Sequence, residues 1–341
     1  MSSGEWHDDW TVRPCTFDDA DTAVDMFNAR SMHFYGENQT TAEDMIGWWK
    51  SPRFDLATDS QAVFDSQGRM IAWAHSGDPG EPYVAFGIGV IVHPEHADCD
   101  ELWDRLFAWA VGLAKDRLPK AAPDLRVSVF ENAMEADTAR RGGAERAGFK
   151  IARVSNAMRI DLDHETPEPV WPTGVLVRSA DVEDDLEAMC MATREAFRDH
   201  WGYVEEPLDQ DLEGWRSWTA SLGERLDPSL WFLACDGDEI AGLGLFSTRI
   251  GDDATRSYVE SLSVRPGYRK RGIALALLRH GFKEVAGRDY KAVELDMDSE
   301  NLTGALRLYE RAGFRVIRRT LSYELVLREG KDLATRVLPV S

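Results

Sequence analysis

The order of hydrophobic and polar residues along this chain predicts short strands that alternate with amphipathic helices. An apolar-rich run at residues 258–264 is typical of a strand, and residues 275–282 have the apolar face of a helix. A second strand is predicted at residues 293–298, and a second helix, ending in a Gly turn, at residues 301–314. The same alternation runs through the rest of the chain, which indicates an α/β fold with a mixed sheet.

The two halves of the chain repeat one pattern. Arg13 and Arg178 lie 165 residues apart, and Phe149 and Phe314, which each end an Ala-Gly-Phe turn, are separated by the same 165 residues. A fixed offset at both ends indicates a duplicated domain.

The predicted domain boundaries follow from this repeat. Residues 164–174 hold three prolines and end in Gly, so they cannot form a helix and are expected to be a semi-rigid linker. We therefore expect a first domain at residues 1–163 and a second domain at residues 175–341.

The segment Arg269–Ala274 joins the strand at residues 258–264 to the helix that follows, and it carries three bases and one Gly. A helix N-terminus has backbone N–H groups without partners and a partial positive charge. Gly272 lets a ligand come close to the backbone. The segment predicts an anion site of the kind that holds a pyrophosphate, and an ordinary strand-to-helix turn is the alternative.

Two motifs together resemble the GNAT N-acetyltransferases. They are R-x-x-G-x-A at Arg269–Ala274, after a strand, and N…A-x-x-L-Y-x-x-x-G-F at residues 301–314. The resemblance covers roughly residues 177–327, and among tandem members of the family the second half is similar to the mycothiol synthase group. It implies two tandem GNAT folds, each a mixed, mostly antiparallel twisted sheet flanked by helices. It also implies acetyl-CoA as cosubstrate and no metal.

The resemblance further implies which residues contact acetyl-CoA. Backbone N–H groups of the basic segment would hold the pyrophosphate, and an N–H near residues 262–264 would face the thioester oxygen. Asn301 would cap its helix and contact the pantetheine arm. The predicted cofactor contacts are Leu262, Val264, Arg269, Lys270, Arg271, Gly272, Ile273, Ala274 and Asn301.

Acyl transfer needs an acid for the departing thiolate and a base for the attacking amine. A Tyr hydroxyl with a pKa of about 10 can protonate a thiolate, and the resemblance places Tyr309 near the sulfur, so Tyr309 is the predicted acid. Strict strand alternation puts Tyr258, Glu260 and Leu262 on one face. The resemblance implies that the face carrying Tyr258 and Glu260 looks onto the acceptor. Glu260 is therefore the predicted base, directly or through a water. Binding of the acceptor ammonium and a merely solvated strand charge are the alternatives for Glu260.

Three further residues lie where GNAT folds bind their acceptors. His200, Trp201 and Tyr203 follow the first helical stretch of the second half and are predicted to line a pocket for an aromatic or sugar-like acceptor. Aromatic packing between helices is the alternative for this group.

The first half departs from the motifs. Ala97 and Asp100 stand at the positions of Arg269 and Gly272, and Ala144 stands at that of the predicted acid. Carboxylates at a pyrophosphate site would repel the ligand. We expect the first domain to be a degenerate GNAT-like domain that does not bind CoA in the usual manner.

Composition narrows the class of protein further. The net charge is −21, from 39 Lys and Arg against 60 Asp and Glu, and both halves are acidic, which argues against nucleic acid and anionic membranes as partners. No apolar run reaches the roughly 18 residues of a transmembrane helix, and the first residues lack the pattern of a secretory signal. Four scattered cysteines indicate reduced thiols, so the expected location is the cytoplasm, with the protein a monomer or homodimer.

The predicted function is transfer of an acetyl group from acetyl-CoA to the primary amine of a small molecule, by direct attack in a ternary complex. One alternative is acetylation of an amino-thiol sugar conjugate, as the mycothiol synthase group implies, although that group has a Glu at the position of Tyr258. The other is an acyl-CoA-binding scaffold or sensor without turnover.

Overall fold

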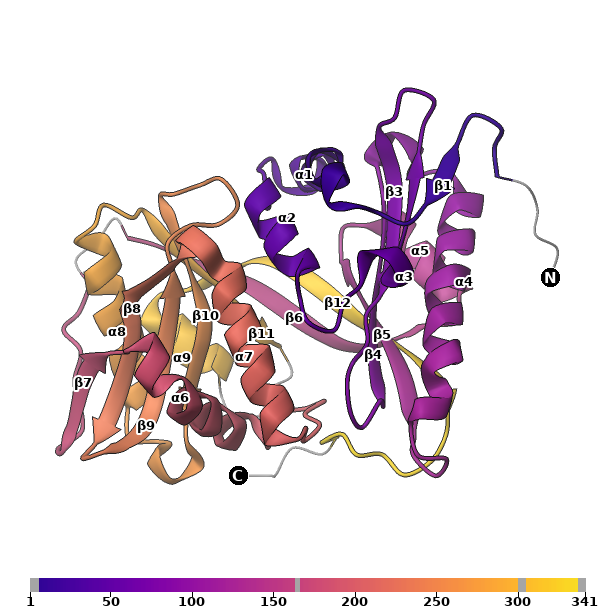
Figure 1. Cartoon of the computed structure of the whole chain (residues 1–341). Coiled ribbons are helices and arrows are strands. Elements are labelled where there is room, and N and C mark those ends of the chain that lie inside the picture. Colours follow the sequence, from indigo (N-terminus) through magenta and orange to yellow (C-terminus); the bar gives the residue numbers. More distant parts are fainter. Residues whose placement is uncertain (1–5, 163–165, 300–304, 337–341) are drawn as a thin grey trace. The chain divides into compact units, whose positions relative to one another are not determined.

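The chain forms two compact units. The structure, a computed structural model, describes residues 6–162, 166–299 and 305–336 (Figure 1). The first unit comprises Met1–Val154 and Thr320–Leu333, and the second comprises Ser155–Arg319 and Ala334–Ser341.

The first unit is a mixed sheet with helices on both faces. Its strand order is β1-β2-β3-β4-β5-β12, antiparallel except for the parallel pair of β4 and β5. Its strands are β1 (Thr11–Arg13), β2 (Ser60–Phe64), β3 (Met70–Ser76), β4 (Ala85–Val92), β5 (Val127–Met134) and the later part of β12 (Arg315–Arg328). Its helices are α1 (Ala20–Tyr35), α2 (Ala42–Trp49), α3 (Leu56–Asp59), α4 (Asp100–Arg117) and α5 (Thr138–Arg146).

The second unit has the same architecture, with the strand order β6-β11-β10-β9-β8-β7 and one parallel pair, β10 with β11. Its strands are β6 (Lys150–Asp161), β7 (Val175–Ser179), β8 (Leu226–Asp236), β9 (Glu239–Ser247), β10 (Arg256–Val264) and β11 (Ala292–Asp298). Its helices are α6 (Val182–Phe197), α7 (Leu208–Leu222), α8 (Ile273–Ala286) and α9 (Ala305–Ala312).

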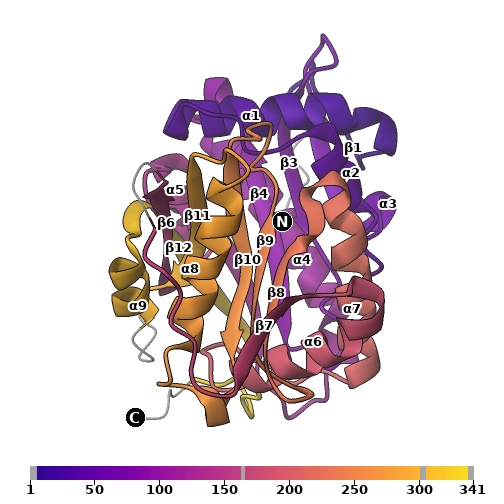
Figure 2. The ribbon, with the colours of Figure 1, turned by 90° about the vertical axis from the view of Figure 1, so that its left-hand side faces the viewer.

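Two apolar clusters cover the two faces of the second sheet. One lies under α8 and α9 and includes Phe282, Leu277 and Phe314, and the other lies under α6 and α7 and includes Met189 and Trp231. Figure 2 shows α8 running alongside the strands at the centre of this unit. The predicted fold class, a mostly antiparallel α/β sheet flanked by helices in each unit, is confirmed.

The local predictions around the basic segment also agree with the structure. Strands β10 and β11 contain the predicted runs at residues 258–264 and 293–298, and α8 begins directly after Gly272. Helix α9 lies inside the predicted range 301–314, whose first residues, 301–304, lie outside the described part of the chain. No helix among the described residues is long and apolar enough to cross a membrane.

Each unit completes its sheet with a strand that lies far away in the sequence. The part of β12 from Thr320 pairs with β5 of the first unit, and the part of β6 from Ser155 pairs with β11 of the second. A linear repeat implies a boundary at residues 163–174, whereas the compact units change over inside β6 and again inside β12. Residues 166–174 contain no helix or strand.

Both units share a separation between their two parallel strands. In the second unit, β10 pairs with β11 over Arg256–Tyr258, and no ladder pair joins the later residues 259–264 and 295–298 in the described structure. In the first unit, β4 pairs with β5 only over Ala85–Gly87. We call the space between the diverging strands the wedge of each unit.

A residue in the last strand should control the stability of the first unit. Tyr323 is fully buried in the core of that unit, and its ring packs beneath α4 and α5. Truncation to Ala should lower the free energy of opening of the β5 amides by about 3–5 kcal/mol, as for other buried aromatic residues. Amide hydrogen exchange of the full chain would measure this.

The control is Val316→Ala, on the same strand but 42% exposed, which should leave β5 unchanged. Equal loss of protection in β5 and β11 in the Tyr323→Ala variant would contradict the assignment of this strand segment to the first unit.

Candidate active site

The basic segment before α8 forms an open anion site. Gly272 is the N-cap residue with a φ of 90°, and Lys270 has a φ of 61°, so both adopt the left-handed conformation. A Cβ on Gly272 would meet nothing within 4 Å, and Lys270 and Arg271 are exposed. The first turn of α8 carries no acidic residue. Backbone N–H groups, the helix dipole and free space therefore coincide at this helix N-terminus.

The side chain of Arg269 is held by the segment that follows α6. Its guanidinium forms a two-pronged ion pair with Asp199, with one N–H···O distance of 3.0 Å, and donates to the Ala196 carbonyl at 2.7 Å. This pairing holds the pKa of Asp199 below its usual range. The predicted role of Arg269 at a pyrophosphate would require the ligand to compete with Asp199.

The predicted acid lies on the α8 and α9 side of the sheet. Tyr309, on α9, is half-buried, and its ring packs edge-on against Phe314 at 5.8 Å between centroids. Burial raises the pKa of Tyr309 to about 12. The hydroxyl therefore stays protonated throughout the neutral and mildly alkaline range.

A β-bulge at Glu260 changes which β10 residues share a face. Val259 pairs with Phe246 and Ser261 with Leu245, so Glu260 is the extra residue opposite β9. Val259 is in the cluster under α8, and Leu262 and Val264 pack against the same cluster. The expectation of strict alternation, with Leu262 on the face of Tyr258 and Glu260, was wrong because it counted no bulge.

The predicted base lies on the opposite face of the sheet from Tyr309. The Glu260 side chain is 13% exposed, and its Oε1 lies 3.6 Å from a guanidinium nitrogen of Arg225, just before β8. The bulge and this cation together fix the carboxylate beside the wedge. Sequence reasoning missed Arg225, because nothing local connects it with β10.

Sequence reasoning also missed a second carboxylate at the wedge, that of Asp296. Tyr258 donates its hydroxyl hydrogen to Asp296 Oδ2 at 2.8 Å, and Asp296 lies on β11 where the two strands have parted. Burial of its surroundings raises the pKa of Asp296, and the hydrogen bond from Tyr258 opposes this rise. The alternation Leu295-Asp296-Met297 could have indicated this residue. Leu295 and Met297 face the α8 cluster, so Asp296 between them faces the other side of the sheet.

Two residues before Asp296 on β11, Glu294 is the centre of a buried ionic cluster. Glu294 is 1% exposed and receives hydrogen bonds from three guanidiniums: Arg159, Arg256 at 2.9 Å and Arg318 at 3.1 Å. These three guanidiniums therefore neutralise the charge of Glu294. This distinguishes it from Asp296, whose hydrogen-bond donor is a neutral hydroxyl.

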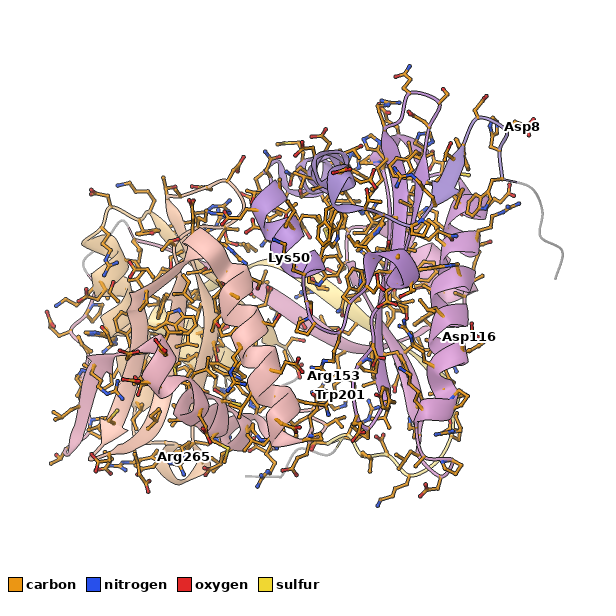
Figure 3. The ribbon with its side chains drawn as sticks, in the orientation of Figure 1. Asp8, Lys50, Asp116, Arg153, Trp201 and Arg265 are labelled. Atoms are coloured by element: carbon orange, nitrogen blue, oxygen red, sulfur yellow. The ribbon has the colours of Figure 1, made fainter. Side chains whose placement is uncertain are left out.

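The predicted acceptor residues lie in the segment after α6. Burial lowers the pKa of His200, which stacks edge-on with Phe197 at 4.5 Å. Arg336 lies over the Trp201 ring at 4.8 Å, and the Tyr203 backbone exchanges hydrogen bonds with the C-terminal segment. Figure 3 labels Trp201 in this segment. The ion pair between Asp199 and Arg269 connects this segment to the basic loop. His200 and Trp201 both make ring contacts, as the packing alternative predicts.

The wedge of the first unit is filled by the chain itself. Glu131, 1% exposed on β5, accepts from Arg140 at 2.5 Å and from the backbone N–H of Val90 on β4. Arg30 donates to the Val92 carbonyl at 2.6 Å and pairs with Asp137, both side chains being buried. Two of these four charged side chains, Glu131 and Arg30, bond to backbone groups of β4 where it has separated from β5.

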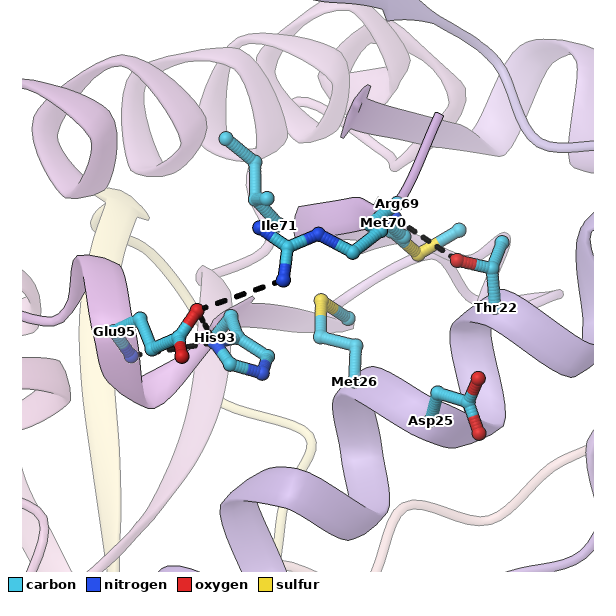
Figure 4. A pocket seen from close by; sticks show the side chains of 8 residues that line it. All are labelled: Thr22, Asp25, Met26, Arg69, Met70, Ile71, His93 and Glu95. Carbon is cyan, nitrogen blue, oxygen red and sulfur yellow. Dashed lines mark hydrogen bonds and ion pairs between the residues drawn. The ribbon is translucent and has the colours of Figure 1, made fainter. Parts of the chain in front are cut away.

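The first unit also lacks an open anion site. Asp100 begins α4, and Glu101 follows in the same first turn. Figure 4 shows a small recess near this loop, formed by α1, β3 and the segment after β4. It encloses about 90 Å³, below the roughly 300–1,000 Å³ of ordinary small-molecule sites. Its lining residues are Thr22, Asp25, Met26, Arg69, Met70, Ile71, His93 and Glu95.

The described residues contain no candidate metal cluster, and their cysteines are free. No group of three His, Cys, Asp or Glu side chains is arranged to hold a metal ion in the ranges that the structure covers. All four cysteines are free thiols, and Cys15, Cys190 and Cys235 are buried.

Comparison with known proteins agrees with this geometry. Residues 188–314 match the acetyltransferase (GNAT) family. A mycothiol acetyltransferase of Streptomyces scabiei is 29% identical over 258 residues, which are 74% of this chain and 76% of that protein. Another, from Geodermatophilus obscurus, is 31% identical over 182 residues, which are 50% of this chain and 55% of that protein.

Solved structures extend the similarity over both units. A GCN5-related N-acetyltransferase from Sphaerobacter thermophilus has a TM-score of 0.78 and 29% identity, covering 98% of this chain and 100% of that one. A tandem GNAT protein from the clavulanic acid biosynthesis pathway has a TM-score of 0.69 and 15% identity, covering 94% and 100%. The resemblance to tandem GNAT proteins is thus confirmed.

Acetyl-CoA should bind the full chain at one site, which Gly272→Glu should abolish. The substitution places a carboxylate at the helix N-terminus and forces a β-carbon into the left-handed region. Isothermal titration calorimetry with acetyl-CoA would give the stoichiometry and affinity.

The matched control is Gly267→Glu, in the same loop, with an ordinary backbone conformation and no atom within 4 Å of an added Cβ. It should bind acetyl-CoA within a few-fold of the unmodified chain. Two sites per chain would mean that the filled wedge of the first unit still admits the ligand.

Proposed function

The chain is a tandem GNAT N-acetyltransferase that depends on an acyl-CoA, and we propose that its second unit transfers the acetyl group of acetyl-CoA to a primary amine of a small molecule. The observation that carries this proposal is the wedge between β10 and β11. It separates a protonated Tyr on one face of the sheet from carboxylates on the other, beside an open basic helix N-terminus.

The residues of this unit suit a pyrophosphate and a pantetheine arm. Exposed Lys270 and Arg271, together with the first N–H groups of α8 at Ile273 and Ala274, would hold the pyrophosphate. The backbone of β10 from Leu262 to Val264, which has no ladder partner on the β11 side, would bind the arm and the thioester oxygen. The remaining predicted contact, Asn301, lies outside the described residues.

In direct transfer, a base on one face of the sheet would accept a proton, and an acid on the other face would donate one. Glu260 would take a proton from the acceptor ammonium, and the freed amine would attack the thioester carbonyl carbon. As the carbon–sulfur bond breaks, Tyr309 would donate its proton to the departing thiolate. Backbone N–H groups of β10 would stabilise the negative charge that develops on the carbonyl oxygen.

A second candidate is acetylation of an amino-thiol sugar conjugate. The mycothiol acetyltransferases favour it, because they match this chain over about three quarters of its length. A panel of butylamine, glucosamine and cysteinyl-glucosamine, assayed by CoA release, would separate the two candidates.

Tyr309→Phe should lower kcat by about 100- to 1,000-fold, the usual contribution of a general acid, and leave the Kd of acetyl-CoA within about two-fold. Because burial raises the pKa of Tyr309 to about 12, its hydroxyl does not ionise below about pH 10. The pH profiles of kcat for both forms should therefore have the same shape on the alkaline side.

The control is Tyr290→Phe, which removes a hydroxyl from another Tyr packed on the same cluster and should retain full turnover. An alkaline fall in the wild type near pH 9 that is absent from Tyr309→Phe would contradict the raised pKa. Unchanged kcat would remove Tyr309 from the mechanism.

Glu260→Gln should reduce kcat by about 100-fold at neutral pH and abolish the acid limb of its pH profile, since the amide cannot accept the proton. If Glu260 only binds the ammonium, KM for the amine would rise instead and the acid limb would persist. Glu310→Gln, on the exposed side of α9, serves as the charge-matched control.

A further inference from the structure

One carboxylate at the wedge, that of Asp296, forms no ion pair within the part of the chain that the structure describes. Glu260 lies beside Arg225, and Glu294 is surrounded by three guanidiniums. Asp296 accepts a hydrogen bond from the neutral Tyr258 hydroxyl, and Arg318, a cation that lowers its pKa, is hydrogen-bonded to Glu294. Its negative charge is therefore available to a ligand.

The position of Asp296 is suited to the acceptor side of the reaction. It lies two residues beyond Glu294, the last β11 residue that pairs with β10, so it borders the wedge. Its neighbours Leu295 and Met297 face the cluster under α8, which places Asp296 on the face opposite Tyr309. Asp296 is exposed to solvent, and desolvation by the protein around it raises its pKa.

The Tyr258 hydrogen bond orients one carboxylate oxygen, and no described residue donates a hydrogen bond to the other. Oδ2 accepts from the Tyr258 hydroxyl at 2.8 Å, so Oδ1 can accept from a second donor. A primary ammonium supplies three N–H donors and the opposite charge, and hydrogen bonds between ions are the stronger kind. A neutral donor would gain the hydrogen bond without the attraction of opposite charges, and an anionic group would be repelled.

We propose that Asp296, oriented by Tyr258, binds the ammonium form of the acceptor and so selects cationic amines as substrates. This inference rests on the proposed acetyl transfer. Tyr258 acts as a positioning residue through Asp296, and Glu260 removes the proton from the ammonium that Asp296 has placed.

The test compares two acceptors in the full chain. Butylamine is an ammonium at pH 7.5, whereas acetohydrazide is a neutral nucleophile at that pH. Asp296→Asn should raise the KM for butylamine by about 10- to 100-fold, with kcat within about three-fold, and should leave the KM for acetohydrazide and the Kd of acetyl-CoA unchanged. Tyr258→Phe should raise the KM for butylamine less, and the double variant should be no worse than Asp296→Asn alone.

Asp298→Asn is the matched control, because it makes the same change two residues later on the same face of β11. An equal rise of KM in both Asn variants would show that the general acidity of this face is responsible, and would overturn the inference. An unchanged KM for butylamine in Asp296→Asn would do so too.

Failure of the proposed function is distinguishable from failure of this inference. If the wild type releases no CoA with any amine, acetyl transfer to small amines is refuted. Recognition by Asp296 is then tested by ¹³C NMR of labelled Asp carboxyls with CoA and butylammonium present. A shift of the resonance that Asp296→Asn removes supports the inference, and the absence of such a shift overturns it.

Discussion

Two parallel strands that stop pairing partway along their length determine the layout of each unit. Backbone N–H and C=O groups inside a protein need partners, and an unpaired buried group costs about 1–3 kcal/mol. The separation of β10 from β11 therefore demands something between the strands. The bulge at Glu260 lies in the part of β10 that no longer pairs with β11, and the basic loop before α8 follows that part.

The two units meet this demand in different ways. In the first, the carboxylate of Glu131 accepts the Val90 N–H, and Arg140 neutralises the buried charge. In the second unit, the residue 165 positions after Glu131 is Asp296, which is exposed and accepts a hydrogen bond from Tyr258. Side chains of the protein itself thus lie in the wedge of the first unit, whereas we propose that substrates bind at the wedge of the second. Opening the first wedge would be costly, since breaking the ion pair would leave the buried Glu131 carboxylate without its cation.

Sequence reasoning succeeded where chemistry and backbone are local. The basic segment, the Gly turn and the alternation of β11 are contiguous, so the motif predicted the strand, the loop and the start of α8. It failed where contacts join distant segments. The pairings of Asp199 with Arg269 and of Arg225 with Glu260 link residues 70 and 35 positions apart, and no local pattern indicates them. The bulge was missed for a related reason, because an extra residue is visible only against the partner strand.

The exchange of terminal strands affects how this protein can be divided. A gene fragment that starts at the Pro-rich segment would encode β7 to β12 but not β6, so β11 would present a bare edge to solvent. The same fragment would end in a strand whose partner, β5, had been discarded. Exposed edges of this kind invite association with other chains. Each unit therefore depends for one strand of its sheet on a segment that a cut at the Pro-rich segment would remove.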